Sequence, residues 1–131
     1  MPEIHLKYQQ LTWQELPDQD NQLAQSAVEA LSGSYSPYSK FKVGAAIKLQ
    51  NGLTITGANQ ENAAYTCGIC AERAALYNAQ SAYPNIKIEA IAIVAQKHDS
   101  PSLEEMISPC GLCRQALTEV ENRQASPIRI L

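Results

Sequence analysis

Apolar residues along the chain follow two different periods, and each period predicts a different kind of element. After Pro17, apolar residues recur at three- and four-residue steps from Leu23 to Leu31, which is the spacing of one face of an α-helix. Gly33 follows this run at a position where glycine commonly caps a helix. The pattern therefore predicts a helix that opens at Pro17 and is capped by Gly33.

Two short segments of β type follow, with a turn signal between them. They cover residues 42–50 and 53–58 and are joined by Asn51 and Gly52. The Asn-Gly pair is typical of a type I′ turn, which needs a positive φ angle at both central positions. We therefore expect an antiparallel hairpin here, preceded by a turn-rich loop over residues 34–41.

The second half of the chain alternates helix-like and strand-like runs. Helical spacing covers residues 70–83 and resumes after Pro109, and the nearly continuous apolar run over 86–95 is typical of a strand buried on both faces. Residues 127–131 complete the pattern as a short last strand. This element order predicts an α/β fold: a three-layer α/β/α sandwich with a mixed sheet and an antiparallel hairpin at one side.

Length and composition predict one domain over residues 1–131, with residues 1–16 as an arm. The chain has 131 residues, of which 45% are hydrophobic and 18% are charged, enough for a single core. It shows neither a signal-peptide pattern nor an apolar run of membrane-spanning length, so we expect a cytoplasmic protein without a membrane partner. The net charge is -3, which disfavours a phosphate backbone, so we do not expect nucleic acid as a partner.

Four cysteines form two C-x-x-C pairs, Cys67 with Cys70 and Cys110 with Cys113. Because cytosolic thiols stay reduced and a core of this size needs no disulfides, metal binding or catalysis is the better interpretation. Thiolates at this spacing suit zinc. The two pairs lie further apart than the roughly 15 to 20 residues of a zinc ribbon, which weakens a structural four-thiolate interpretation and leaves both kinds of site open at this point.

A more specific pattern lies within the same residues. The segment from Cys70 to Glu72, followed by P-C-G-L-C over residues 109–113, matches a known signature of zinc nucleobase deaminases. Three protein ligands leave the fourth zinc position to water, whose pKa falls toward neutrality so that hydroxide is available to attack a carbon atom. Glu72 follows a candidate ligand by two residues, which suits it to reach that water and to move protons as the catalytic residue.

Three thiolates around Zn²⁺ leave a negatively charged site, so an offsetting charge is expected nearby. Both cysteine groups fall at predicted helix starts, where backbone N–H groups favour anions. Arg73 directly follows Glu72, and we expect its guanidinium to donate a hydrogen bond to a ligand thiolate. Gln115 is a weaker candidate for a contact behind the ligands. The alternative for Arg73 is an ordinary helix residue that points into solvent.

The chain resembles the small homotetrameric cytidine deaminases of nucleoside salvage. The resemblance runs from Tyr35 to Gln115 and rests on five motifs in one order: YSPYSKFKVGAA, the N-G of the hairpin, NQENAAY, CAERAAL and SPCGLCRQ. It implies that Cys70, Cys110 and Cys113 hold zinc, with one ion per subunit, and that Glu72 is the proton shuttle. Cys67 matches no ligand position of that family.

The resemblance also implies that Phe41, Asn59 and Glu61 contact a nucleoside substrate. Phe41 offers a flat apolar surface to the base, and Asn59 and Glu61, two residues apart on an extended segment, can both face the sugar. The alternatives are core packing for Phe41 and a polar turn for the other two. His5 and His98 lie far from the motifs in the sequence, and we assign neither to the site.

The leading hypothesis is therefore the hydrolytic deamination of cytidine and deoxycytidine to uridine and deoxyuridine, with release of ammonia. Two alternatives stay open: a deaminase of another aminopyrimidine nucleoside, or a structural four-cysteine zinc module that binds a protein or nucleic acid. Cys67 distinguishes the last of these, since it would be a ligand only there. The resemblance implies a homotetramer, and the chain is expected to lack the family's usual C-terminal segment beyond Leu131.

Overall fold

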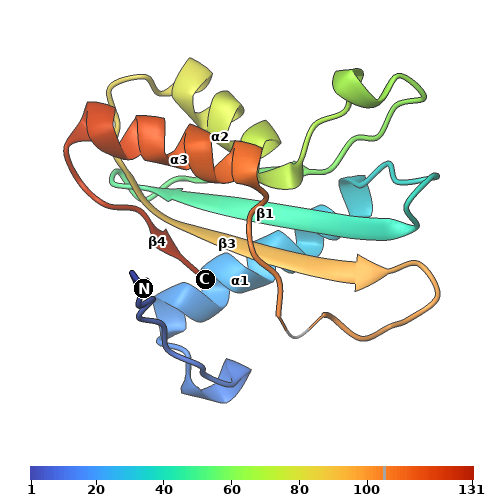
Figure 1. The fold of residues 1–131 in the computed structure, drawn as a ribbon, viewed down its shortest axis with the longest axis horizontal. Coiled ribbons are helices and arrows are strands. Elements are labelled where there is room, and N and C mark those ends of the chain that lie inside the picture. The colour runs from blue at the N-terminus through green and yellow to red at the C-terminus, as the bar shows by residue number, and fades with distance from the viewer. Residues whose placement is uncertain (105) are drawn as a thin grey trace.

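The computed structural model describes residues 1–104 and 106–131, and its elements follow the predicted order (Figure 1). The helices and strands are α1 (Asp18–Ala30), β1 (Phe41–Leu49), β2 (Thr54–Ala58), α2 (Ala71–Ala82), β3 (Ile88–Lys97), α3 (Gly111–Gln124) and β4 (Arg129–Ile130). Short 3-10 helices cover Trp13–Glu15, Leu31–Gly33 and Tyr65–Cys67. The predicted ranges differ from these bounds by one or two residues at most ends, where hydrogen bonding rather than apolar spacing decides the limit.

A four-stranded sheet in the order β2-β1-β3-β4 forms the middle layer. Strand β1 is antiparallel to both β2 and β3, whereas β4 is parallel to β3, so the sheet is mixed with the hairpin at one edge. Strand β3 lies inside the sheet and is buried along most of its length, as its apolar run predicted. Helix α1 covers one face, and α2 and α3 cover the other (Figure 1), which confirms the three-layer α/β/α fold.

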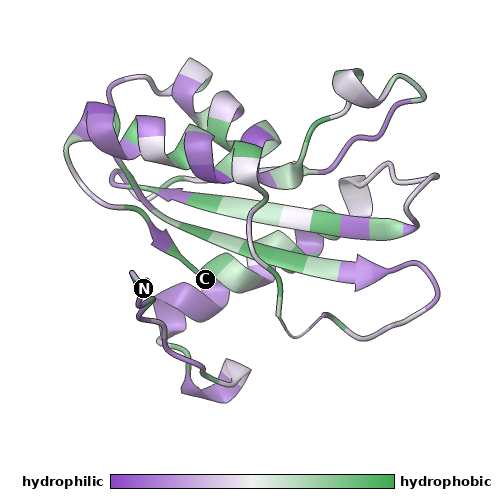
Figure 2. Cartoon of the chain, in the orientation of Figure 1, coloured by the Kyte–Doolittle hydropathy of each residue, from purple (hydrophilic) through white to green (hydrophobic). Residues whose placement is uncertain are grey.

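The sheet separates two apolar clusters, one under each layer of helices. Figure 2 shows hydrophobic residues along the middle of β1 and β3, while the helices carry hydrophobic and hydrophilic residues on the same turns. On the α1 side, Leu23 and Ala27 pack against small residues of the sheet such as Ala92. On the other side, Leu76 of α2 and Leu117 of α3 pack in a second cluster with sheet residues such as Ile91.

A glycine lets helix α2 approach the sheet closely. A Cβ atom on Gly57 of β2 would lie 2.5 Å from the backbone nitrogen of Ala75 in α2, closer than real Cβ contacts allow. The backbone of β2 therefore lies directly under α2. This close packing sets the distance between the sheet and the start of α2. Cys70 and Glu72 are located at that helix start.

Two predicted details at element ends are wrong. Helix α1 ends at Ala30 and passes into a 3-10 turn, and Gly33 does not take the left-handed conformation of a glycine cap. The hairpin turn is not of type I′, because φ is positive at Gly52 (90°) and not at Asn51. Instead, the side chain of Asn51 accepts a hydrogen bond from the backbone N–H of Leu53 at 3.1 Å, which makes a local turn of its own.

Residues 1–16 form the expected arm, and all of them are exposed except Leu16, which is half-buried against the core on the α1 side. Asn21 of α1 donates a hydrogen bond from its side chain to the backbone oxygen of Trp13 at 2.9 Å. This bond ties the end of the arm to the first helix. Across the described ranges 1–104 and 106–131, none of the helices is long and apolar enough to cross a membrane.

Candidate metal centre and active site

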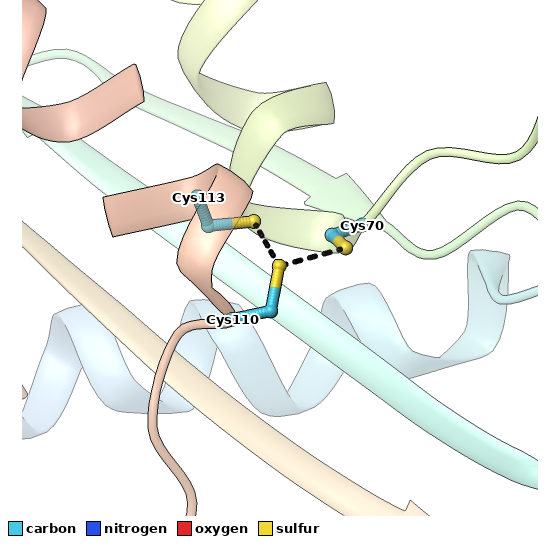
Figure 3. A group of neighbouring side chains, drawn as sticks. All are labelled: Cys70, Cys110 and Cys113. Atoms are coloured by element: carbon cyan, nitrogen blue, oxygen red, sulfur yellow. Dashed lines mark hydrogen bonds between the residues drawn. The ribbon is translucent and has the colours of Figure 1, made fainter. Parts of the chain in front are cut away.

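Three cysteines from the starts of two helices point toward one another above the sheet (Figure 3). Cys70 is the N-cap residue of α2, Cys110 is the N-cap residue of α3, and Cys113 lies in the first turn of α3. Cys110 Sγ lies 3.7 Å from Cys70 Sγ and 3.5 Å from Cys113 Sγ. The structure thus brings together the three cysteines predicted as ligands, while Cys67 is exposed and lies outside the cluster.

The sulfur spacing fits a tetrahedral zinc ion. With a Zn–S bond of about 2.3 Å, two sulfur ligands at tetrahedral corners lie about 3.8 Å apart. The two measured separations, 3.7 and 3.5 Å, are close to that value, and all three sulfur atoms lie within 4.8 Å of one another. Thiolates are also the soft ligands that zinc binds well. The donor set therefore fits zinc with three protein ligands, the number typical of catalytic sites.

Two neighbouring thiols have their pKa values shifted in opposite directions, one lowered by the start of α3 and the other raised by burial. The backbone N–H of Cys113 lowers the pKa of the Cys110 thiol more than any other group does. Burial raises the pKa of the Cys113 thiol, and the negative charge of Glu72 raises that pKa further. A divalent cation reverses this penalty, because it replaces the proton and stabilises the thiolate. The cluster therefore has the electrostatics of a site that needs a cation.

Glu72 brings a carboxylate to the edge of the thiol cluster. It lies in the first turn of α2, and only 6% of its surface is exposed. Its charge acts on the pKa of Cys113, which places the two groups near one another. None of the ion pairs in the described part of the chain involves Glu72. A buried carboxylate beside candidate metal ligands is well placed to accept and release a proton.

Arg73 points toward the thiols rather than into solvent. Its Nη2 donates a hydrogen bond to Cys70 Sγ at 3.7 Å, and this bond raises the pKa of Arg73. Among the described side chains, Arg73 Nε is the one buried nitrogen or oxygen atom without a hydrogen-bond partner. Gln115, in contrast, is exposed on α3, and no hydrogen bond in the described ranges joins it to a thiol.

Asn59 and Glu61 bind the loop over residues 34–41. Asn59 Oδ1 accepts a hydrogen bond from the backbone N–H of Val43 at 2.9 Å, and Asn59 Nδ2 donates to the backbone oxygen of Phe41 at 2.9 Å. Glu61 Oε1 accepts from the backbone N–H groups of Tyr38 and Ser39 at 3.0 and 3.1 Å. The two side chains that were predicted to face the sugar therefore fix the loop that leads to Phe41.

These hydrogen bonds lower the pKa of the Glu61 carboxyl. Burial by itself acts to raise the pKa of the Glu61 carboxyl, but the backbone N–H and hydroxyl of Ser39 and the backbone N–H of Tyr38 outweigh it, so the pKa is lowered. Oε1 makes the two contacts to the loop. A carboxylate has a second oxygen with further lone pairs, which is chemistry suited to accepting from a sugar hydroxyl.

Phe41 lies at the start of β1, opposite Lys97 of β3. It is half-buried and lines a hollow of about 440 Å³ together with Ser39, Lys40, Lys97, His98 and Asp99. None of the cysteines lines this hollow.

His98, to which the sequence assigned no role, directly follows β3, and its Nε2 lies 2.8 Å from Ser36 Oγ. No short sequence motif could show this contact, because the pairing of β1 with β3 brings these distant segments together.

Comparison with known proteins agrees with this geometry. Residues 17–126 match the family model of the cytidine and deoxycytidylate deaminase zinc-binding region. A cytidine deaminase of Halalkalibacterium halodurans is 43% identical over 98 residues, which are 75% of this chain and 69% of the relative. A cytidine deaminase of Mycobacterium tuberculosis is 40% identical over 105 residues, which are 79% of this chain and 74% of the relative.

Solved structures give the same result for the fold. The crystal structure of cytidine deaminase from Mycobacterium tuberculosis superposes with a TM-score of 0.68 and 34% identity, over 85% of this chain and 82% of that one. The structure from Burkholderia pseudomallei superposes with a TM-score of 0.62 and 38% identity, over 78% and 75% of the two chains. Since the family match spans most of the sheet and all three helices, including every cysteine of the cluster, the chain belongs to the zinc-binding cytidine and deoxycytidylate deaminase family.

Proposed function

We propose that this protein is a zinc-dependent cytidine deaminase that converts cytidine and deoxycytidine to uridine and deoxyuridine, with release of ammonia, in pyrimidine salvage. The observation that carries the proposal is the cluster of Cys70, Cys110 and Cys113 at two helix starts, with the buried carboxylate of Glu72 beside it. The family membership and the relatives named cytidine deaminase support the same reaction.

The three cysteines would hold the zinc ion, which when bound activates water for attack on a carbon atom. In the proposed reaction Glu72 accepts the two protons of the attacking water in turn, and delivers one to the ring nitrogen and the other to the departing amine. Its burial in the first turn of α2 holds the carboxylate at one place beside the ligands. Arg73 offsets the negative charge of three thiolates through its hydrogen bond to Cys70.

Phe41, Asn59 and Glu61 are the proposed substrate contacts. One hydrogen of Asn59 Nδ2 is used by the backbone oxygen of Phe41, which leaves the second hydrogen to donate to a ligand. Glu61 uses Oε1 for the loop, so Oε2 can accept. A donor and an acceptor two residues apart complement sugar hydroxyls, which both donate and accept, while the ring of Phe41 offers an apolar face to the base.

Exposed tyrosines around this region support self-association, and we include a homotetramer in the proposal. Tyr35, Tyr38 and Tyr65 expose 55%, 61% and 93% of their surfaces. Aromatic side chains of this kind are enriched at protein interfaces. Light scattering coupled to gel filtration should give the mass of four chains, and a monomer mass at micromolar concentration would contradict this part of the proposal.

The decisive experiment measures zinc content and ammonia release on the same purified sample. We expect about one zinc per chain and ammonia release from cytidine and deoxycytidine, with no release after the metal is removed by a chelator and recovery when zinc is added back. A panel with other aminopyrimidine nucleosides tests the substrate. A zinc-loaded protein that releases no ammonia from either nucleoside would overturn the proposal.

A further inference from the structure

His98 joins the end of β3 to the loop over residues 34–41 by two contacts. Its backbone N–H donates to the backbone oxygen of Lys40 at 2.9 Å, and its Nε2 lies 2.8 Å from Ser36 Oγ. Ser36 exposes only 3% of its surface, whereas His98 is exposed, so the second contact is partly buried. Lys40 has a φ of 56°, a left-handed conformation that is unfavourable for a side chain other than glycine. The contact with His98 therefore holds a strained turn in place.

Hydrogen bonds continue from His98 to the amide of Asn59. Ser36 Oγ lies 3.1 Å from Ser34 Oγ, and Ser34 Oγ donates to Asn59 Oδ1 at 2.5 Å. The other partners of this amide identify its oxygen and nitrogen, because the backbone N–H of Val43 donates to Oδ1 while Nδ2 donates to the backbone oxygen of Phe41. Asn59 Oδ1 is therefore an acceptor for Ser34.

The three contacts from His98 through Ser36 and Ser34 to Asn59 can all be hydrogen bonds in only one direction of donation. Ser34 has a single hydroxyl hydrogen, and Asn59 Oδ1 takes it. Ser36 must then donate its own single hydrogen to Ser34 Oγ. The hydrogen between Ser36 and the imidazole consequently belongs to His98, on Nε2. Every bond in the row points the same way, from His98 toward Asn59, and bonds aligned in this manner strengthen one another.

We propose that His98 is a positioning residue for the nucleoside: its Nε2–H donates into a one-way hydrogen-bond chain through Ser36 and Ser34 that orients the amide of Asn59. The inference rests on the proposed function, since it takes Asn59 as a substrate contact. His98 acts through Asn59 and through the loop before Phe41. A defect in the chain should therefore weaken nucleoside binding and leave the proton transfers of Glu72 unaffected.

The first test needs no enzyme activity. The protein contains two histidines, so nitrogen NMR of histidine-labelled protein gives two imidazole signals, which a His5→Gln variant assigns. Under alkaline conditions, where a neutral ring carries one hydrogen, we expect that hydrogen on Nε2 of His98. A hydrogen on Nδ1 with a bare Nε2 would overturn the hydrogen-bond chain. This result stands even if cytidine proves not to be a substrate, so failure of the proposed function and failure of this inference are distinguishable.

The second test separates substrate binding from chemistry. His98→Leu should raise KM for cytidine about tenfold with kcat nearly unchanged, because an interaction made equally in the ground and transition states has been lost. His98→Gln places an amide donor near the position of Nε2 and should recover most of the loss. His5→Leu, the same substitution on the exposed arm, should leave both constants unchanged.

Ser36→Ala interrupts the chain at its middle and should reproduce the KM effect of His98→Leu. This variant also keeps the test decisive if His98→Leu does not fold. An unchanged KM in a folded His98→Leu or Ser36→Ala protein, or a fall in kcat with KM unchanged, would contradict the proposal. Failure of His98→Gln to recover binding while Ser36→Ala binds normally would contradict it as well.

Discussion

Glu72 and Arg73 bring opposite charges to the same three thiols. The charge of Glu72 raises the pKa of Cys113, while the guanidinium of Arg73 donates to Cys70 Sγ. In the proposed reaction the two residues therefore have separable roles, since one moves protons and the other offsets the charge of the ligands. At the scale of the residue, metal content and turnover should respond differently to changes at each position.

Glu72→Gln should retain zinc and lose kcat for cytidine by about 10²- to 10⁴-fold, because the amide cannot accept and return a proton. Ammonia release and zinc content are measured on the same preparation. Glu119→Gln, at an exposed position of α3, is the matched control and should keep full activity. Substantial turnover by the Glu72 variant would show that another group carries the proton.

Arg73→Gln should weaken zinc binding by about 10-fold or more, since the charge that offsets three thiolates is lost. Competition with a chromophoric chelator measures the affinity. Arg123→Gln removes the same charge from an exposed position near the end of α3 and should leave zinc affinity unchanged. Equal affinities for the Arg73 variant and the native protein would contradict the assigned role.

Cys67 and Cys70 give a paired test of the ligand set. Cys70→Ser should lose zinc, because its sulfur lies in the cluster, whereas Cys67→Ser should keep both zinc and activity, because its thiol is exposed outside it. Zinc content after gel filtration is the measurement. Loss of zinc from both variants would instead support a structural four-thiolate site.

At the scale of the element, the positions of the proposed ligand Cys70 and the proposed catalytic residue Glu72 depend on how closely helix α2 approaches strand β2. The backbone of Gly57 lies against the backbone of Ala75, where a Cβ has no room. Since Cys70 and Glu72 lie at the start of that helix, any outward movement of α2 changes their distance from the ligands on α3. The glycine therefore supports the site without touching it.

Gly57→Ala should destabilise the protein by about 1 to 3 kcal/mol and reduce zinc affinity, because the helix must move to admit the methyl group. Urea unfolding and chelator competition measure the two effects. Gly33→Ala is the matched control, since its Cβ would lie 3.6 Å from the Cβ of Ala58, an ordinary contact. Unaltered stability of the Gly57 variant would mean that the two backbones separate without cost.

At the scale of the whole molecule, an ion pair joins the first helix to the last strand. Arg129 of β4 donates to both carboxylate oxygens of Asp20 in α1, at 2.9 and 2.8 Å. Asp20 is buried, whereas 58% of the Arg129 side chain is exposed. The hydrogen bonds from Arg129 lower the pKa of the Asp20 carboxyl. Because solvent screens the exposed partner, the pair contributes about 1 kcal/mol rather than the larger values of buried pairs.

Asp20→Asn should therefore lower the free energy of unfolding by about 1 kcal/mol at neutral pH. The folded-state pKa of Asp20 lies below its unfolded value, so this contribution is present above the unfolded pKa and disappears as pH falls through the folded one. The difference between variant and native protein should thus shrink in acid. Urea unfolding at several pH values tests this, with the exposed Asp18→Asn as control. A difference that persists or grows in acid would contradict the assignment.

Much of the fold was predictable because the spacing of apolar residues within short segments indicates helices and strands. The apolar run of β3 predicted a buried strand, and the steps from Leu23 to Leu31 predicted a helix. The predictions of a type I′ turn and of a glycine cap at Gly33 were wrong. Backbone and side-chain hydrogen bonds determine how a helix or hairpin ends, and the pattern of apolar residues does not contain them. The residues of the thiol cluster were predictable because C-x-E and C-x-x-C are short motifs, each at a single helix start.

The sequence by itself therefore determined which residues can supply the metal site, since they lie in short motifs at two helix starts. The packing of α2 beside α3 brings Cys70 to within 3.7 Å of Cys110, 40 residues away, and that step belongs to the tertiary structure. Only the tertiary structure decided how the loop over residues 34–41 is held. His98 and Ser36 are 62 residues apart and belong to no common motif, and the antiparallel pairing of β1 with β3 brings them within hydrogen-bond distance. Strand pairing is a long-range event, so the hydrogen-bond chain from His98 to Asn59 exists only once the sheet has formed.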